Sequence, residues 1–390
     1  MGKRAFVACL LAAGLLCALS ASAEAALVWD IQTVDSGGSV GSYTSLALDS
    51  YGLPHISYRD STNASLKYVH WDQESSSWAG LGGSWTVDST GSVGYFSSLA
   101  LDSSGSPHIS YFDWATDYWD LKCVYWDGDS WEGLGGSWVV DSEGMVGYET
   151  SLALDSNGYP HISYNDATND NLKCARWTGS SWDIGDVAGV GWALAGDTSL
   201  ALDSSGHEHI SYYDDADGDL SYAEWTGSSW VIRDVPDWTA GGYNSLALDS
   251  TGNVHIAYWG DGKVKHAVWN GSSWQIDVVD TIGAIGGTMS LALDDRDYPH
   301  IAYHYYAEDD LRYAYWDGSS WTVETVDSEG NVGLYASLGL DSYGFPHISY
   351  LDSTNSSLMY AMGTPEPATC VLGLLSLGFV GLYVRRRKRS

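Results

Sequence analysis

The sequence predicts an all-β fold: a seven-bladed β-propeller of four-stranded blades, preceded by a signal peptide and followed by a transmembrane helix. Three observations support it, namely a pentapeptide that recurs seven times, short stretches of alternating polarity, and an orphan copy of one repeat strand near the N-terminus. The 390 residues include 45 Gly, 20 Trp and 27 Tyr, a composition typical of short strands joined by tight turns. The predicted segments are residues 1–25, 26–363 and 364–390.

The first segment has the features of a secretory signal peptide. Lys3 and Arg4 precede an apolar run over residues 5–19, and small residues follow up to Ala25. A basic, then an apolar, then a small-residue region is the pattern that signal peptidase recognises. We expect cleavage after Ala23 or Ala25, and therefore export.

The body consists of a repeat of 45–53 residues. Ser-Leu-Ala-Leu-Asp occurs seven times, with Gly339 in place of Ala in the last copy. Its Asp residues occupy positions 49, 102, 155, 203, 249, 294 and 341, and six residues after each a His begins His-Ile-(Ser/Ala)-Tyr. Repeats of this length are typical of propeller blades.

Each repeat contains four short stretches that alternate with period two, for example residues 45–49, 55–58, 66–71 and 85–88. Such alternation predicts half-buried strands. The first two are linked by a tight turn with an Asp that can accept backbone N–H groups and, in most copies, a Gly that can adopt positive φ.

The ends of the repeat array predict a closed ring. The last repeat stops after Tyr360 and lacks the Trp-containing fourth strand, whereas an orphan copy of that strand occupies residues 29–35. Pairing this N-terminal strand into the last blade would remove the exposed edges of an open array.

Residues that recur in every blade are interpreted as structural, because a catalytic group is normally needed once. The seven Asp and His pairs are therefore expected to lock each hairpin by hydrogen bonding. Repeated Trp pairs such as Trp177 and Trp182 are expected to pack between blades. Cys123 and Cys174 occupy equivalent positions in successive repeats, too far apart for a disulfide, so both are expected to be free and buried.

Positions that differ between repeats are the candidates for function. The loops between strands two and three, and those between blades, share one face of a propeller, and the Trp residues outside the repeat pattern map to them. The candidate ligand-binding residues are Trp114, Trp119, Trp192, Trp238, Trp259, Asp113, Asp166, Asp214, Tyr305 and Tyr306. Indole rings beside carboxylates suit sugars, which stack on the ring and donate hydroxyl hydrogen bonds. Alternatively, these aromatics cover loop backbone or plug the channel.

The body is strongly acidic, with 10 basic and 48 acidic residues between residues 26 and 364 and hence a net charge of −38. This charge argues against nucleic acid as a partner and indicates either a solubilising surface or divalent-cation binding. Asp215, Asp217 and Asp219 alternate around a Gly as in calcium loops, but the distal Glu is missing. Apart from this incomplete Ca²⁺ motif, no cofactor is predicted.

The C-terminal segment combines a tripeptide, an apolar span and a basic cluster. Pro365-Glu366-Pro367 is followed by 17 uncharged residues, 368–384, and then by Arg385-Arg386-Arg387-Lys388-Arg389. As a helix the apolar span would be roughly 26 Å long, enough to cross a bilayer core. The basic cluster is expected to stay cytoplasmic, which leaves the body on the other side of the membrane.

In this order the three features resemble the PEP-CTERM sorting signal of Gram-negative bacteria. The resemblance covers about the last 27 residues and implies that an exosortase recognises and removes the tail. It also implies an inner-membrane anchor facing the periplasm before sorting, and the cell surface or the extracellular space afterwards, often with exopolysaccharide. An ordinary C-terminal anchor is the alternative.

Two functions follow from the sequence, and the first is preferred. One is a non-enzymatic binding module for polysaccharide or a surface protein. The other is a polysaccharide-active enzyme, a lyase or glycosidase, because Asp-Ser-x-Gly-x-Pro-His-Ile is similar to segments of sialidase and polysaccharide-lyase propellers. Sialidases use three arginines, and of the five in the body only Arg59 maps to the predicted face. A lyase would draw on His304, Tyr306 and Lys263, which show no supporting spacing.

Overall fold

The computed structural model describes residues 27–114, 119–191, 197–237, 240–281, 283 and 285–365. The predicted signal peptide, the candidates Trp192 and Trp238, and the tail from Glu366 to Ser390 lie outside the described residues. Within the described part, no helix is long and apolar enough to cross a membrane. The chain divides into two compact units, of which the propeller is residues 31–362.

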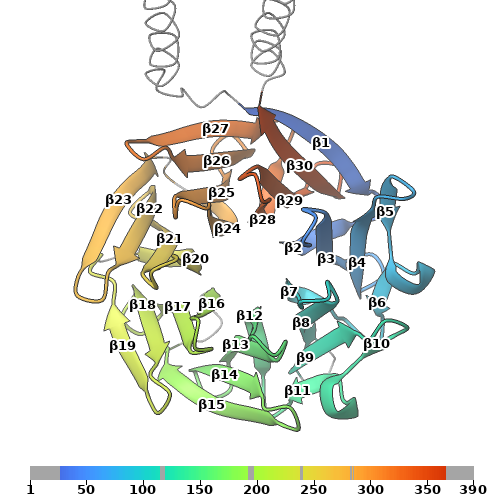
Figure 1. Cartoon of the computed structure of the whole chain (residues 1–390), viewed down its shortest axis with the longest axis horizontal. Coiled ribbons are helices and arrows are strands. Elements are labelled where there is room, and N and C mark those ends of the chain that lie inside the picture. Colours follow the sequence, from blue (N-terminus) through green and yellow to red (C-terminus); the bar gives the residue numbers. More distant parts are fainter. Residues whose placement is uncertain are drawn as a thin grey trace, which may run out of the picture. The chain divides into compact units, whose positions relative to one another are not determined.

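Seven antiparallel sheets surround a central channel, with the first strand of each blade innermost (Figure 1). The predicted seven-bladed propeller is therefore confirmed. Blade 1 contains β2 (Val40–Leu48), β3 (Pro54–Asp60), β4 (Ser65–Asp72), β5 (Ser77–Ala79) and β6 (Thr86–Asp88). Blade 2 contains β7 (Tyr95–Leu101), β8 (Pro107–Trp114), β9 (Trp119–Trp126), β10 (Trp131–Glu132) and β11 (Val139–Asp141).

The next four blades have four strands each. Blade 3 contains β12 (Val146–Leu154), β13 (Pro160–Asp166), β14 (Asn171–Trp177) and β15 (Trp182–Gly189). Blade 4 contains β16 (Thr198–Leu202), β17 (Glu208–Asp214), β18 (Asp219–Trp225) and β19 (Trp230–Asp234). Blade 5 contains β20 (Ala240–Leu248), β21 (Val254–Gly260), β22 (Lys263–Trp269) and β23 (Trp274–Thr281). Blade 6 contains β24 (Ile285–Leu293), β25 (Pro299–Tyr305), β26 (Asp310–Trp316) and β27 (Trp321–Asp327).

Blade 7 closes the ring as predicted. It contains β28 (Val332–Leu340), β29 (Pro346–Asp352), β30 (Ser357–Pro365) and, as its outer strand, β1 (Leu27–Asp35). Val34 of β1 is buried in the core between blades 7 and 1, together with Leu46 and Leu358. The N-terminal strand is thus an integral part of the last blade.

In blades 1 and 2 the outer strand is split, a feature that the sequence analysis did not predict. The 3₁₀ turns η1 (Leu81–Gly83) and η2 (Leu134–Gly136) separate its two halves, which accounts for the longer first two repeats. Gly82 has φ 61°, and a Cβ at this position would lie 3.2 Å from the Trp126 ring of the next blade. The turn therefore covers that indole, and only glycine fits closely there.

A ring of serine side chains joins all seven inner strands. The Ser of each Ser-Leu-Ala-Leu segment accepts a hydrogen bond from the backbone N–H of the repeated Leu in the next blade, at 2.9–3.0 Å. The acceptors are Ser45, Ser98, Ser151, Ser199, Ser245, Ser290 and Ser337. This explains why a serine recurs at a position where an apolar residue would otherwise fit the core.

A second set of contacts joins the second strand of each blade to the inner strand of the next, and its two partners change together between polar and apolar. Where the second strand reads His-Ile-Ser, its Ser bonds a hydroxyl or amide on the next inner strand, as Ser163 does with Thr198 (2.9 Å). Where it reads His-Ile-Ala, the equivalent partner is apolar, and Ala257 shares a core cluster with Met289. Buried polar atoms are therefore introduced in matched pairs.

The outer strands contribute carboxylates to the next blade. Asp35 of β1 accepts hydrogen bonds from the Tyr58 hydroxyl (2.7 Å) and Lys67 Nζ (2.6 Å) of blade 1. The same arrangement recurs at Asp88, Asp141 and Asp237, and at Asp280 with an arginine in place of lysine. Cys123 and Cys174 are free and buried, as predicted.

The repeated Asp and His are structural, but their partners differ from the expected lock. Asp49 Oδ1 accepts the backbone N–H groups of Tyr51 and Leu53, both at 2.8 Å, and so fixes the turn. His55 Nε2 lies 4.0 Å from Asp49, beyond hydrogen-bonding distance. Its Nδ1 instead pairs with the Tyr68 hydroxyl on the third strand.

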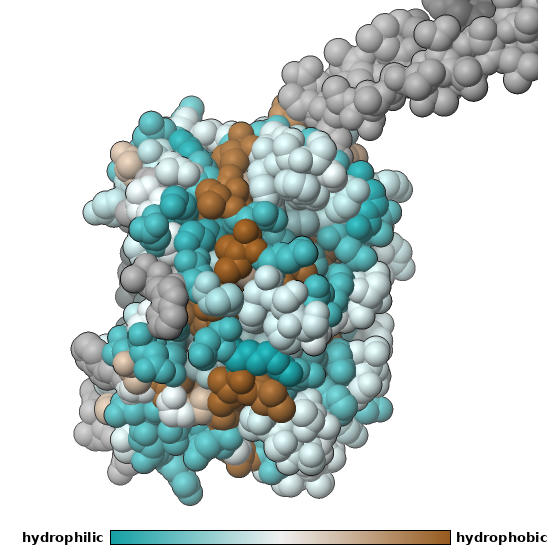
Figure 2. Space-filling view, turned by 90° about the vertical axis from the view of Figure 1, so that its left-hand side faces the viewer, coloured by the Kyte–Doolittle hydropathy of each residue, from teal (hydrophilic) through white to brown (hydrophobic). Residues whose placement is uncertain are grey.

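The circumference of the ring carries isolated apolar side chains on a polar surface, as Figure 2 shows for one side. Among them are Ile232 of β19 (46% exposed), Val278 of β23 (50%) and Val323 of β27 (36%). Scattered exposure of this kind is normal for an outer strand flanked by charged residues.

Candidate functional site

Two sets of loops meet on one face of the ring, which we call the upper face. They are the loops between the second and third strands and those that lead to the next blade. Backbone hydrogen bonds join the two sets: the Ser61 N–H donates to the Ser39 carbonyl and the Ala167 N–H to the Met145 carbonyl, both at 2.8 Å. Variable side chains from both loop sets can therefore act together.

Trp114 and Trp119 lie opposite each other at the upper end of blade 2. They pair across β8 and β9, and their ring centroids are 5.1 Å apart. Trp114 is 44% exposed, an unusual exposure for an indole that no packing requirement explains.

A continuous series of aromatic rings leads from these tryptophans to the channel. Tyr95 lies 5.6 Å from Trp114, and Tyr43 lies 5.5 Å from Tyr95 and 4.6 Å from Tyr335. We call the whole set the aromatic strip; its members are Trp119, Trp114, Phe112, Tyr95, Phe96, Tyr43 and Tyr335. The strip draws on blades 2, 1 and 7, so no single repeat contains it.

Arg59 supports the strip from below. Its guanidinium lies 3.7 Å from the centre of the Tyr95 ring and donates hydrogen bonds to the Val93 carbonyl and to Ser92 Oγ (3.2 Å). The side chain is 5% exposed. Arg59 therefore positions an aromatic residue and is occupied by loop backbone, which removes the arginine that a sialidase-like site would need.

In six of the seven blades the pairing register shifts near the start of the inner strand, where one side chain turns toward the channel, whereas β16 of blade 4 pairs regularly. In β2 the pairing register shifts between Val40 and Ser42, and again before Ser45. Gly41 has φ 97°, and a Cβ there would lie 2.8 Å from the Leu358 backbone. Tyr43 follows with φ 53°. Such backbone conformations in non-glycine residues concentrate at functional sites.

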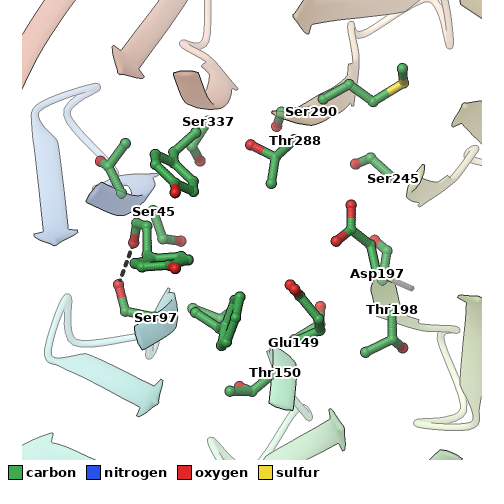
Figure 3. Close-up of a pocket in the computed structure, with 18 of the residues that line it drawn as sticks. Ser45, Ser97, Glu149, Thr150, Asp197, Thr198, Ser245, Thr288, Ser290 and Ser337 are labelled. Carbon is green, nitrogen blue, oxygen red and sulfur yellow. Dashed lines mark hydrogen bonds between the residues drawn. The ribbon is translucent and has the colours of Figure 1, made fainter. Parts of the chain in front are cut away.

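The re-aimed side chains surround a cavity of about 160 Å³ in the channel. They occupy the position two residues before each repeated Ser, and they are Tyr43, Phe96, Glu149, Asp197, Tyr243, Thr288 and Tyr335. All except Tyr243 line the cavity. Figure 3 shows Glu149, Asp197 and Thr288 extending toward it from three blades, with Ser and Thr side chains around the same opening.

Glu149 and Asp197 form a coupled pair of carboxyl groups on adjacent blades. Burial raises the pKa of Glu149 well above its usual range, and repulsion from Asp197 adds to the shift. Burial also raises the pKa of Asp197, to about 6, although a hydrogen bond with Glu149 opposes that shift. Near neutral pH the pair therefore retains a proton between its two members.

The predicted acidic site residues are mostly occupied by local contacts. Asp113 is buried and pairs with Lys122 at 2.7 Å. Asp166, also buried, accepts the N–H groups of its own turn. Asp214 accepts the Ala216 N–H at 2.9 Å, and burial raises the pKa of its carboxyl.

The remaining predicted aromatics are divided between core and surface. Trp259 is partly buried and packs against the core cluster of Met289 and Ile301, opposite Gly242 on the neighbouring strand. The Tyr305 ring lies 3.8 Å from the Arg312 guanidinium, whereas Tyr306 is 61% exposed. Aromatic contacts thus connect Trp114 and Trp119 to the channel. Trp259, Tyr305 and Tyr306 are not part of this connected set.

In the described part of the chain the predicted ion site is not assembled, whereas of the predicted lyase residues His304 and Tyr306 lie together, with ring centroids 6.4 Å apart. There, no group of three or more His, Cys, Asp or Glu side chains is placed to hold a metal ion, and this includes Asp215, Asp217 and Asp219. His304 is 1% exposed, and Lys263 pairs with Asp261 at 3.3 Å.

A second depression, of about 870 Å³, lies between blades 2 and 3. Its floor is the Asp141 and Lys173 pair. Since equivalent pairs recur at other blade interfaces, we assign it a structural role.

Comparison with known proteins identifies the type of sorting signal at the C-terminus. The family description "PEP-CTERM protein-sorting motif" matches residues 364–388. The chain carries a PEP-CTERM motif. It is therefore made as an exported, membrane-anchored precursor that an exosortase processes. Pro365, the first residue of the tripeptide, is also the last residue of β30.

Solved structures show the same fold at low sequence identity, and no curated protein matches the chain. A protein of unknown function from Dyadobacter fermentans is 12% identical, with 86% of this chain and 98% of that chain covered and a TM-score of 0.51. A PL25 ulvan lyase is 13% identical, with 87% and 94% covered and a TM-score of 0.54. At these identities the likeness establishes the propeller alone.

The channel positions were missed in the sequence analysis, which concentrated on tryptophans in loops. The signal was nevertheless present. In the seven repeats aligned on Ser-Leu, the residue two positions after the Ser is Ala in six copies and Gly in the seventh. The residue two positions before the Ser is Tyr, Phe, Glu, Asp or Thr. This is the variation expected of a ligand-facing position inside a repeated framework.

Proposed function

We propose that the propeller is a non-enzymatic binding module for polysaccharide, displayed at the cell surface or in the extracellular matrix after exosortase processing. The observation that carries this proposal is the aromatic strip, which runs from exposed Trp114 to the channel. Sugar rings stack on such surfaces through their C–H faces. A surface protein is the other partner that an exposed aromatic patch would fit.

The central test compares two exposed aromatics on opposite faces. Trp114→Ala should weaken polysaccharide binding about tenfold, which corresponds to about 1.4 kcal/mol. Tyr51→Ala is the matched control, because Tyr51 is 84% exposed but lies in a turn on the lower face. Affinity electrophoresis or a glycan array of residues 26–364, with and without Ca²⁺, measures both. Equal effects of the two substitutions would contradict the proposal.

The second candidate is a polysaccharide-active enzyme, favoured by the shared fold with an ulvan lyase solved with -[GlcA(1-4)Rha3S]- (14% identity, TM-score 0.55). Two features weigh against it. Glu149 and Asp197 are hydrogen-bonded to each other, whereas glycosidase carboxyl groups stand about 5–9.5 Å apart. Among the described residues that line the cavity, none is a Lys, Arg or His that could neutralise a uronate.

Incubation with ulvan and other uronate polysaccharides separates the two candidates. For a binding module we expect retention of the polymer without new reducing ends or unsaturated uronate, measured by a reducing-sugar assay and ultraviolet absorbance. Product release that a His304→Ala variant abolishes would establish the enzyme.

A further inference from the structure

The charges around the channel cavity are unbalanced. Glu149 and Asp197 are among the described residues that line it, and none of the others is Lys, Arg or His. Most of the Ser, Thr and Asn groups that line the cavity take part in contacts between blades, as Thr198 does with Ser163 (2.9 Å). Glu149 and Asp197 instead bond each other across two blades, and they are the carboxyl groups among the described lining residues.

Aromatic rings form much of the opposite wall. Tyr43, Phe96 and Tyr335 all line the cavity, and the Tyr43 centroid lies 4.7 Å from Phe96 and 4.6 Å from Tyr335. Aromatic faces carry negative electrostatic potential and attract cations within about 6 Å of their centres. Carboxylates on one side and ring faces on the other are both complementary to a positive group.

The protonation of the carboxyl pair also favours a positively charged ligand. Tyr148, Tyr243 and Tyr335 face the pair, and burial raises the pKa of each, so they stay neutral in the physiological range. The pair itself holds a proton because burial and mutual repulsion oppose full ionisation. A bound cation would replace this proton and remove the repulsion.

We propose that the channel cavity is a binding site for the ammonium group of an amino sugar, and that the ligand is a polysaccharide with unacetylated hexosamine residues. The proposal rests on the proposed polysaccharide-binding function and specifies its ligand. The polysaccharide lies along the aromatic strip toward the channel, and the cavity binds one of its amine-bearing sugar rings. Its volume of about 160 Å³ equals roughly ten water-sized spheres, the size of a monosaccharide.

Calorimetry with matched oligosaccharides tests this. Glucosamine oligomers should bind residues 26–364 at least tenfold more tightly than N-acetylglucosamine oligomers of equal length. The double variant Glu149→Gln/Asp197→Asn should lose this preference, whereas Trp114→Ala should weaken both ligands and keep it. Glu74→Gln/Asp129→Asn removes the same charge from exposed turns and should change nothing.

A measurement on the unmodified protein guards against a variant that misfolds. Titrations near pH 6 in two buffers of different ionisation enthalpy should show proton release for glucosamine oligomers and none for the acetylated series. Equal binding of both series would overturn the inference while leaving the polysaccharide-binding proposal intact. Equal binding of putrescine, or Ca²⁺ binding lost in the double variant, would also overturn it. Failure of every polysaccharide to bind would refute the proposed function itself.

Discussion

At the scale of the residue, burial has opposite consequences for two classes of acidic side chain. Burial alone would raise the pKa of Asp141, but hydrogen bonds from Lys173 and Tyr164 outweigh it and hold the pKa below its usual range. For Glu149, burial and the neighbouring Asp197 both raise the pKa. Asp141 and its equivalents thus stabilise the contacts between blades as anions. Glu149 and Asp197 in the channel bond each other instead of a basic side chain.

We expect Asp141→Asn to destabilise the propeller by about 2 kcal/mol near neutral pH, because it removes the nearer of the two carboxylates that pair with Lys173 and leaves Asp166 at 3.7 Å. A lowered native pKa contributes stability that is present above the unfolded-state pKa and is lost as the pH falls through the native value. The gap between wild type and variant should therefore shrink on acidification. Urea unfolding across an acid-to-neutral series measures it, with exposed Asp129→Asn as control. A gap that is constant with pH would contradict this account.

At the scale of the element, the bulge near the start of six of the seven inner strands connects the framework to the site. The glycine of the bulge allows the strand to approach the neighbouring blade, and the next residues present their side chains to the channel. In blade 2, a Cβ on Gly94 would lie 2.9 Å from the Leu66 backbone. Steric pressure at this glycine would be transmitted directly to Tyr95 and Phe96.

Two glycines of blade 2 with nearly equal φ allow a controlled test. Gly94 has φ 84° and a crowded Cβ position, whereas Gly105 has φ 83° and nothing within 4 Å. Gly105→Ala should cost about 1 kcal/mol, the strain of a left-handed alanine. Gly94→Ala should cost clearly more, since backbone must move, and should also weaken polysaccharide binding. Thermal unfolding and binding assays on both variants measure this; equal losses would show that the close approach is unimportant.

The elements also show which features can be predicted from sequence. Blade number and ring closure were predictable, because repetition reveals the strands and the orphan copy around Trp29 has one possible partner. Individual side-chain directions were not. A bulge reverses the alternation on which strand patterns depend, so Tyr43 and Glu149 looked like ordinary strand residues. Trp259 was placed among the ligand-binding residues, since nothing in its own repeat shows that its ring packs against the Met289 cluster of the next blade.

At the scale of the whole molecule, stability depends on every blade having two neighbours. The serine ring is complete only because Leu46 of blade 1 donates to Ser337 of blade 7. The outer strand of blade 7 comes from the other end of the chain, and its Asp35 bonds blade 1. A body with a net charge of −38 adds self-repulsion that an unclosed ring would resist poorly.

Removing residues 27–35 should therefore open the molecule at one place. The lost folding free energy includes about 1.5 kcal/mol from the burial of Val34 and about 1.5–3 kcal/mol from the hydrogen bonds of Asp35. The deletion also leaves β30 with an unpaired edge. We expect a lower unfolding temperature and self-association, measured by calorimetry and light scattering. A peptide of residues 27–35 added in trans should restore the monomer, whereas the same peptide with Val34→Asp should not. A truncated protein that stays monomeric with an unchanged unfolding temperature would show that the serine ring and the inner strands close the propeller without its N-terminal strand.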